Sequence, residues 1–137
     1  MSEPRVRVPK DKTDLVDKLV KSEERSYGAL SSRADVLTFC AVLGFRKGKR
    51  EPVAESANDI RYDVFRNRGH DFVFDVLALA ETEDPGVLEN TSEAQKERNR
   101  IFEEYANGGL EILSDEFRGT VEMLDSLLLV IQRESDS

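Results

Sequence analysis

The sequence predicts a mainly α-helical protein with one short N-terminal strand, and three patterns support this fold class. Residues 5–8 (RVRV) alternate between charged and apolar side chains and lie between Pro4 and Pro9, as in a short edge strand. Apolar side chains then recur at helical spacing in residues 10–22 and fill most of residues 36–45. Strand, helix and helix in this order resemble a ribbon-helix-helix unit, and a helical C-terminal part follows.

The two N-terminal helices are predicted to differ in burial. Residues 10–22 carry apolar side chains on one face only, which indicates an amphipathic helix of about three turns. Ser32 and Asp35 form a variant of the capping box at the start of the second helix. Because residues 36–45 are apolar on nearly all sides, we expect this helix to lie in the core or in a homodimer interface. Residues 23–31 form a polar connection, longer than a compact ribbon-helix-helix unit has.

The middle of the chain alternates between short elements and turns. Residues 52–58 read as a loop, and residues 60–65 allow one further short strand. We expect a turn at residues 66–69 and a helix at residues 71–80, followed by a loop at 82–90 with an Asp-Pro-Gly turn.

The C-terminal part is predicted to be helical, with interruptions at its glycines. Ser92 and Gln95 resemble a second capping box before a long helix. Gly108-Gly109 interrupts the helical pattern, by close helix contact or a kink, and Gly119-Thr120 marks the next boundary. One face of the final helix then carries Val121, Leu124, Leu128 and Ile131.

Length and charge indicate one domain, residues 1–137, with two differently charged parts. Apolar residues make up 39% of the chain, enough for a single core. Residues 1–50 hold 12 Lys/Arg and 7 Asp/Glu, a net charge of +5, whereas residues 51–137 hold 8 and 21, a net charge of -13. This asymmetry suggests faces with different partners, although acidity that merely keeps the protein in solution would give the same totals.

The residues for common catalytic chemistry are mostly missing from the sequence. The chain has one histidine, His70, and one cysteine, Cys40, so it cannot assemble a Cys/His zinc site. It also lacks a Gly-rich phosphate loop of the Walker type. Asp71 and Asp75 share a helix face and leave a carboxylate-held Mg²⁺ as a minor alternative. We therefore expect no enzyme activity, no metal and no cofactor.

The sequence also predicts a cytoplasmic protein without membrane contact. Its apolar runs are shorter than the roughly 18 residues that a membrane span needs. Residues 1–10 are polar and contain two prolines, unlike a signal peptide, and a lone cysteine fits a reducing compartment.

The basic N-terminal third suggests contact with DNA. Alternation places Arg5 and Arg7 on one strand face, and pairing with the strand of a second copy would give a ribbon that fits the major groove. Basic residues that follow could contact phosphates. The candidate DNA-binding residues are Arg5, Arg7, Lys10, Arg33, Arg46, Lys47, Lys49 and Arg50. The alternative is an edge strand with solvated arginines followed by a basic loop.

Four stretches resemble a family of small proteins associated with DNA phosphorothioation (Dnd) systems of bacteria and archaea. They are residues 7–12 (RVPKDK), 34–45 (ADVLTFCAVLGF), 77–82 (LALAET) and 101–113 (IFEEYANGGLEIL), and the last is the most specific. The resemblance runs from about Arg5 to Ile131. It brings no catalytic motif, and it implies a role beside enzymes that place sulfur in the DNA backbone or restrict DNA lacking it, as a defence against phage.

Pattern and resemblance together favour an accessory or regulatory DNA-binding protein of a phosphorothioation system. Its expected partners are DNA, other proteins of the system and a second copy of the chain. A protein adaptor of the restriction complex without DNA contact is the main alternative, and a metal-dependent nickase is a weaker one.

Overall fold

The computed structural model describes residues 4–21 and 31–135, and it confirms a mainly α-helical fold with a short N-terminal strand. The elements in chain order are β1 (Arg5–Val6), η1 (Lys10–Lys12), α1 (Thr13–Lys21), α2 (Arg33–Lys47), β2 (Ile60–Arg61), α3 (Tyr62–Asn67), α4 (Asp71–Thr82), η3 (Pro85–Leu88) and α5 (Ser92–Ser135). Most of the polar connection predicted at residues 23–31 lies outside the described residues, as does Ser22, the predicted end of the first helix. None of the described helices is long and apolar enough to cross a membrane.

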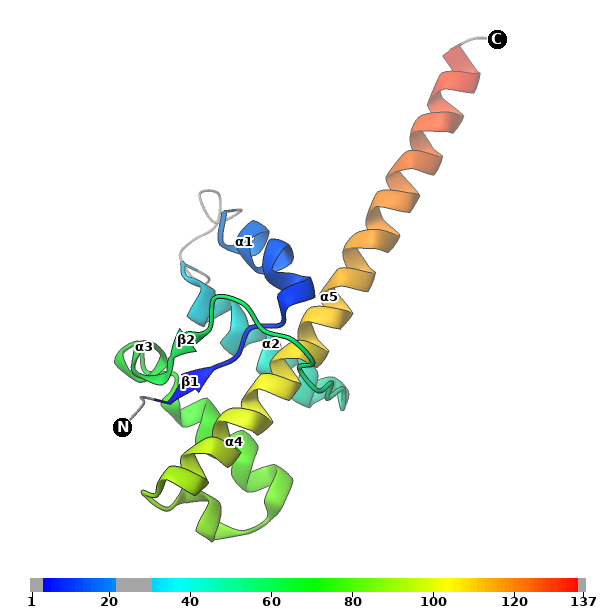
Figure 1. Cartoon of the computed structure of the whole chain (residues 1–137). Helices are drawn as coiled ribbons and strands as arrows, with labels where there is room; N and C mark the ends of the chain where they lie inside the picture. The colour runs from blue at the N-terminus through cyan, green and yellow to red at the C-terminus, as the bar shows by residue number, and fades with distance from the viewer. Residues whose placement is uncertain (1–3, 22–30, 136–137) are drawn as a thin grey trace.

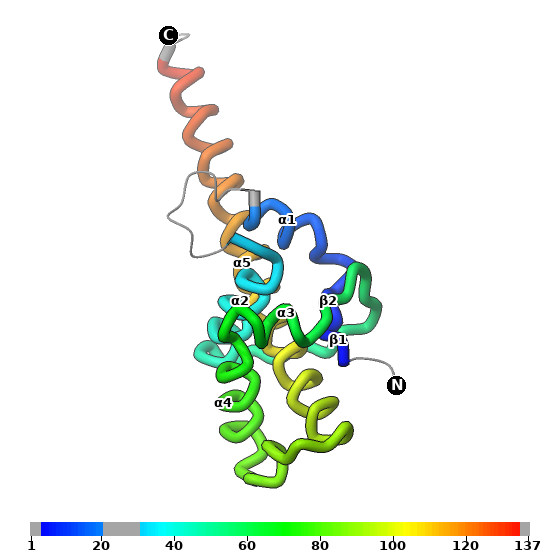
Figure 2. The backbone as a smooth tube through the Cα atoms, turned by 90° about the vertical axis from the view of Figure 1, so that its left-hand side faces the viewer, coloured from blue at the N-terminus to red at the C-terminus, as the bar shows by residue number. Residues whose placement is uncertain are grey.

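The core forms where α2, α4 and the first half of α5 meet. Phe65 of α3, Phe74 of α4 and Phe102 of α5 are fully buried, and the rings of Phe74 and Phe102 stack 3.8 Å apart. Val6 and Val8 enter the same core from the N-terminal segment. Figures 1 and 2 show that α5 runs through this body with its N-terminal half and extends far beyond it with its C-terminal half.

Helix α2 begins and ends as its sequence suggests. The Ser32 hydroxyl accepts a hydrogen bond from the Asp35 backbone N–H at 3.2 Å, which confirms the predicted cap. Gly48 ends the helix in the left-handed conformation, with φ of 67°. The most extensive pairing of α2 is with α5 of the same chain, so this helix contributes to the core. Its outer side keeps Phe39, Val42 and Phe45 exposed.

The two strands pair with each other inside one chain. β1 and β2 are antiparallel, with Arg5 opposite Arg61 and Val6 opposite Ile60. The other edge of the N-terminal segment is also occupied: the Arg7 N–H donates to Glu103 and the Arg5 carbonyl accepts from Asn99, both on α5. The ribbon expected from two copies is therefore replaced by pairing within the chain, because both hydrogen-bonding edges already have partners.

Three predicted boundaries were wrong. The segment 60–65 is a strand only at Ile60–Arg61, because Tyr62 and Phe65 bury their rings at helical spacing in α3. The cap of α5 is Thr91, whose hydroxyl accepts from the Ala94 N–H at 3.1 Å, one residue earlier than the predicted Ser92.

The third wrong boundary concerns the glycines of α5, which is continuous from Ser92 to Ser135. A glycine costs a helix only about 1 kcal/mol relative to alanine, which packing can offset. The sequence suggested close helix contact or a kink as the reason for Gly108 and Gly109. The structure shows close contact. A Cβ atom at Gly109 would overlap the Cys40 carbonyl of α2, and one at Gly108 would overlap the Lys49 carbonyl.

We predict that Gly109→Ala destabilises the protein by about 2 kcal/mol or more, because α2 and α5 must separate to accept the methyl group. Gly119→Ala is the matched control in the same helix. A Cβ there meets no atom within 4 Å, so we expect a stabilisation of up to about 1 kcal/mol. Urea unfolding of both variants measures the two changes. Equal changes of the same sign would contradict the close-contact explanation.

Candidate nucleic-acid interface

Arg5 and Arg7 point away from the core, as the alternation predicts. Val6 and Val8 are buried, whereas both arginines are exposed. The backbone bonds of the segment to β2 on one side and to α5 on the other hold it in place. The two guanidinium groups are thus presented to solvent from a fixed backbone.

A groove lies beside β1, and we name it the β1 groove. It has a volume of about 910 Å³. Its lining consists of Pro4, Arg5, Arg7, Tyr62, Asp63, Arg66, Asn90, Thr91, Ser92, Gln95, Lys96, Asn99 and Glu103. Four of these residues are cationic and two are acidic, in a chain of net charge -8, and Arg66 is paired with Asp63 at 3.0 Å. The first turns of α5 form one wall, so the positive end of the helix dipole adds to the attraction for anions.

Glu103 is a buried carboxyl group on the wall of the β1 groove. It is 7% exposed, and one of its oxygens accepts the Arg7 N–H at 3.2 Å. Burial raises its pKa to about 7, although the bond from Arg7 acts in the opposite direction. The net charge of the groove lining therefore becomes more positive as the pH falls below neutral.

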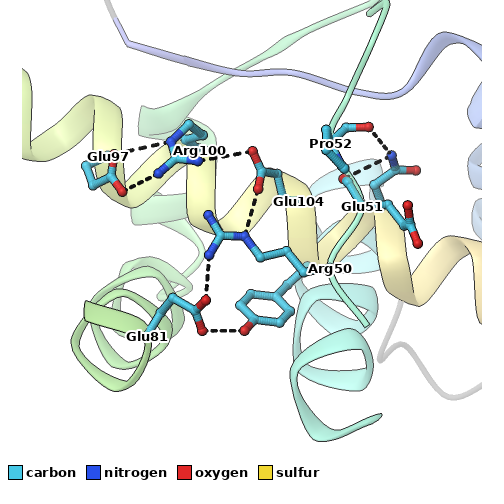
Figure 3. Close-up of polar contacts among 9 residues, drawn as sticks. Arg50, Glu51, Pro52, Glu81, Glu97, Arg100 and Glu104 are labelled. Carbon is cyan, nitrogen blue, oxygen red and sulfur yellow. Dashed lines mark hydrogen bonds and ion pairs between the residues drawn. The ribbon is translucent and has the colours of Figure 1, made fainter. Parts of the chain in front are cut away.

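Arg50, predicted to contact phosphate, instead lies in an internal network (Figure 3). Its Nε donates to Glu104 at 2.7 Å and its Nη1 donates to Glu81 at 2.6 Å. The guanidinium also lies over the ring of Tyr105, at 5.6 Å from the centroid, and the Tyr105 hydroxyl donates to Glu81. These contacts join the segment that follows α2 to α4 and α5. The Arg50 guanidinium therefore stabilises the fold and is not free to bind phosphate.

The other predicted phosphate contacts lie away from the β1 groove. Lys10 forms an ion pair with Glu55 at 3.8 Å, and Arg33 donates to the Asn58 carbonyl at 3.1 Å. Arg46 and Lys47 lie in the last turn of α2, with Lys49 just beyond it. In Figures 1 and 2 this end of α2 and β1 lie on opposite sides of α5. Of the eight predicted residues, therefore, only Arg5 and Arg7 line the β1 groove.

The most specific stretch of the sequence, within residues 101–113, holds the elements of the fold together. Glu104 accepts from Arg50 and Arg100. Asn107 accepts from the buried Lys12 Nζ at 2.6 Å and donates to the carbonyls of Glu51 and Pro52, as Figure 3 shows for the two carbonyls. Together with the two glycines that follow, these residues fix the segments after α2 and before α1 against α5.

His70 and Cys40 have structural surroundings. The His70 Nε2 lies 2.6 Å from Asp35, which also accepts two hydrogen bonds from Arg68. The bonds from Arg68 hold the pKa of the Asp35 carboxyl well below its usual range. Burial raises the pKa of the Cys40 thiol to about 12, far from a reactive thiolate.

The carboxylates offer no ready metal cluster in the part of the chain that the structure describes. No group of three or more His, Cys, Asp or Glu residues that could hold a metal ion occurs among residues 4–21 and 31–135. Asp75, one of the two carboxylates considered for Mg²⁺, faces Arg98 at 3.6 Å. This ion pair gives Asp75 a partner other than a metal.

Sequence reasoning missed four charged residues of the β1 groove, namely Asp63, Arg66, Lys96 and Glu103. They come from α3 and α5 and lie far from Arg5 in the chain, so no local pattern links them. Arg66 and Arg68 flank Asn67 in the predicted turn at residues 66–69. These two basic residues were the local feature of the sequence that could have suggested Arg66 as a DNA contact.

One family model matches almost the whole chain. The model of a family described as DNA sulphur modification system-associated protein 4 matches residues 5–137. No curated protein matches the chain, and no solved structure matches it. The family match covers every lining residue of the β1 groove except Pro4, and the whole of α5.

We predict that Glu103→Gln stabilises the protein more at about pH 8 than at about pH 5, by about 2 kcal/mol. A carboxyl with a raised pKa binds more protons in the folded state, so the free energy of unfolding falls as the pH rises from about 4.5 to about 7. Glutamine keeps an acceptor for the Arg7 N–H but cannot ionise. Urea unfolding of wild type and variant at both pH values measures the effect, and an equal difference at both would contradict it.

Proposed function

Because this chain belongs to the family of DNA sulphur modification system-associated protein 4, we propose that it is a non-catalytic accessory protein that contacts DNA through the β1 groove. The observation that carries the proposal is the presence of Arg5, Arg7, Arg66 and Lys96 on one groove of an otherwise acidic protein. Positive side chains on a fixed backbone suit the regular charge of a phosphodiester chain.

The contact fits the DNA backbone better than the base edges. β1 is two residues long and both of its edges are occupied, so it is not the two-stranded ribbon that enters a major groove. The cations and the N-terminal turns of α5 are groups that bind phosphate oxygens. Contacts of this kind position a protein on DNA for the enzymes it accompanies, with little sequence preference.

A second candidate is an adaptor that binds proteins of the system and not DNA. The net charge of -13 on residues 51–137 would repel a duplex. The exposed C-terminal half of α5 also offers apolar surface to another protein. Direct DNA binding by the purified chain separates the two candidates.

We predict that the pair Arg5→Ala and Arg7→Ala weakens binding to a short duplex by about tenfold or more at about 50 mM salt, where screening is weak. The slope of affinity against salt should fall by about two units, one for each lost contact. Fluorescence anisotropy measures both quantities, with unmodified and phosphorothioate-containing duplexes compared in parallel.

The pair Arg46→Ala and Lys47→Ala is the matched control, since it removes the same charge from two exposed side chains on the opposite side of α5. We expect it to change the affinity much less. Equal weakening by both pairs would refute a specific role for the β1 groove. If the wild-type chain does not bind at this low salt, the adaptor function replaces the DNA contact.

A further inference from the structure

The C-terminal half of α5 is an exposed helix with an unusual amount of apolar surface. Every residue from Asp115 to Glu134 is exposed, and the helix extends away from the body (Figure 1). Its large apolar residues, each between 48% and 61% exposed, are Phe117, Val121, Met123, Leu124, Leu127, Leu128, Leu129, Val130 and Ile131. Exposed apolar area of this extent marks an interaction site.

Five of these residues form a regular line, which we name the distal seam. They are Phe117, Val121, Leu124, Leu128 and Ile131. The intervals between them are four, three, four and three residues, which is the spacing of the core positions of a coiled coil. A seam of this spacing on a helix fits another helix that carries the same spacing.

The charges beside the distal seam fit a second copy in the antiparallel direction. The flanking positions that directly follow Phe117 and Leu124 carry Arg118 and Asp125. If Val121 of one copy packs on Leu124 of the second, Phe117 packs on Leu128, and Arg118 lies beside Asp125 of the second copy. The two-fold symmetry makes each contact twice, so two ion pairs form.

Other alignments lose this match. Moving one antiparallel helix by seven residues places either Arg118 beside Arg118 or Asp125 beside Asp125 of the second copy. A parallel pair in register places Asp125 beside Thr120 and makes no ion pair at these positions. Among residues 4–21 and 31–135 of one chain, the ion-pair partner of Arg118 is Asp115, at 3.7 Å between two well-exposed side chains. Such a surface contact is weak and opposes the new pairing little.

We propose that the distal seam is a self-association site at which two copies of this chain pair antiparallel, with Arg118 of each beside Asp125 of the other. This pairing places the homodimer expected from the sequence on α5. The two bodies lie at opposite ends of the helical pair, each with its own β1 groove. The pairing does not depend on DNA binding.

The first experiment measures the mass of the full chain in solution at micromolar concentration by light scattering and sedimentation. We expect two copies for the wild type and one for Leu124→Glu, which places a charge in the seam. Leu129→Glu is the matched control, because Leu129 is equally exposed on α5 but lies outside the seam. A monomeric wild type, or an assembly that Leu124→Glu leaves intact, overturns the proposal.

The second experiment tests the direction by reversing charges. Arg118→Asp alone and Asp125→Arg alone should each weaken self-association by about tenfold, since each brings like charges together twice. The chain that carries both changes should recover the wild-type association, because opposite charges meet again. Failure of the double variant to recover overturns the antiparallel pairing, whatever the outcome of the DNA measurements.

A cross-link provides an independent check of the same alignment. Ile131 of one copy should lie at the level of Ser114 of the other, so the chain with both Ser114→Cys and Ile131→Cys should form a disulfide-linked dimer on oxidation. Ile131→Cys alone should not, because the two copies of residue 131 lie at opposite ends of the seam. Efficient cross-linking of the single variant would indicate a parallel pair and overturn the proposal.

Discussion

The close approach of α2 and α5 is the contact on which the rest of the structure depends. Gly44, Gly108 and Gly109 have no side chain, and this lets the backbones of the two helices, and of the segment after α2, touch. Dispersion and apolar burial are gained along both helices when their axes come near. Once the axes are close, polar groups at the crossing such as Asn107 and the Lys12 ammonium are buried and need partners within the protein.

Those partners come from segments far apart in the sequence. Arg50 reaches α4 and α5 at once, and Asn107 serves the Lys12 ammonium and two carbonyls. A single removed partner would leave buried polar groups unsatisfied, which costs more than the bond itself contributes. The charges near the crossing are therefore part of the fold. Arg50 is an example. It lies in a basic stretch that suggested phosphate contacts, but its guanidinium donates to two glutamates.

The sequence predicted well what local spacing determines and poorly what distant contacts determine. The alternation at residues 5–8 and the cap at Ser32 are local, and both are confirmed. The glycines in α5 suggested breaks by their helix propensity, but whether a glycine ends a helix depends on what packs against it. The β1 groove combines residues of β1, α3 and α5, so only Arg5 and Arg7 among its lining residues could be predicted from the sequence.

One rigid element joins the groove and the distal seam. The first turns of α5 line the β1 groove, and its C-terminal half carries the seam. A helix rises about 1.5 Å per residue, so Ser92 and Phe117 are separated by about 40 Å along the axis. Because α5 is continuous across its glycines and is held by α2 at Gly109, this separation is fixed and not set by a flexible linker. Whatever binds at the seam is thus held at a defined distance and direction from whatever binds in the groove.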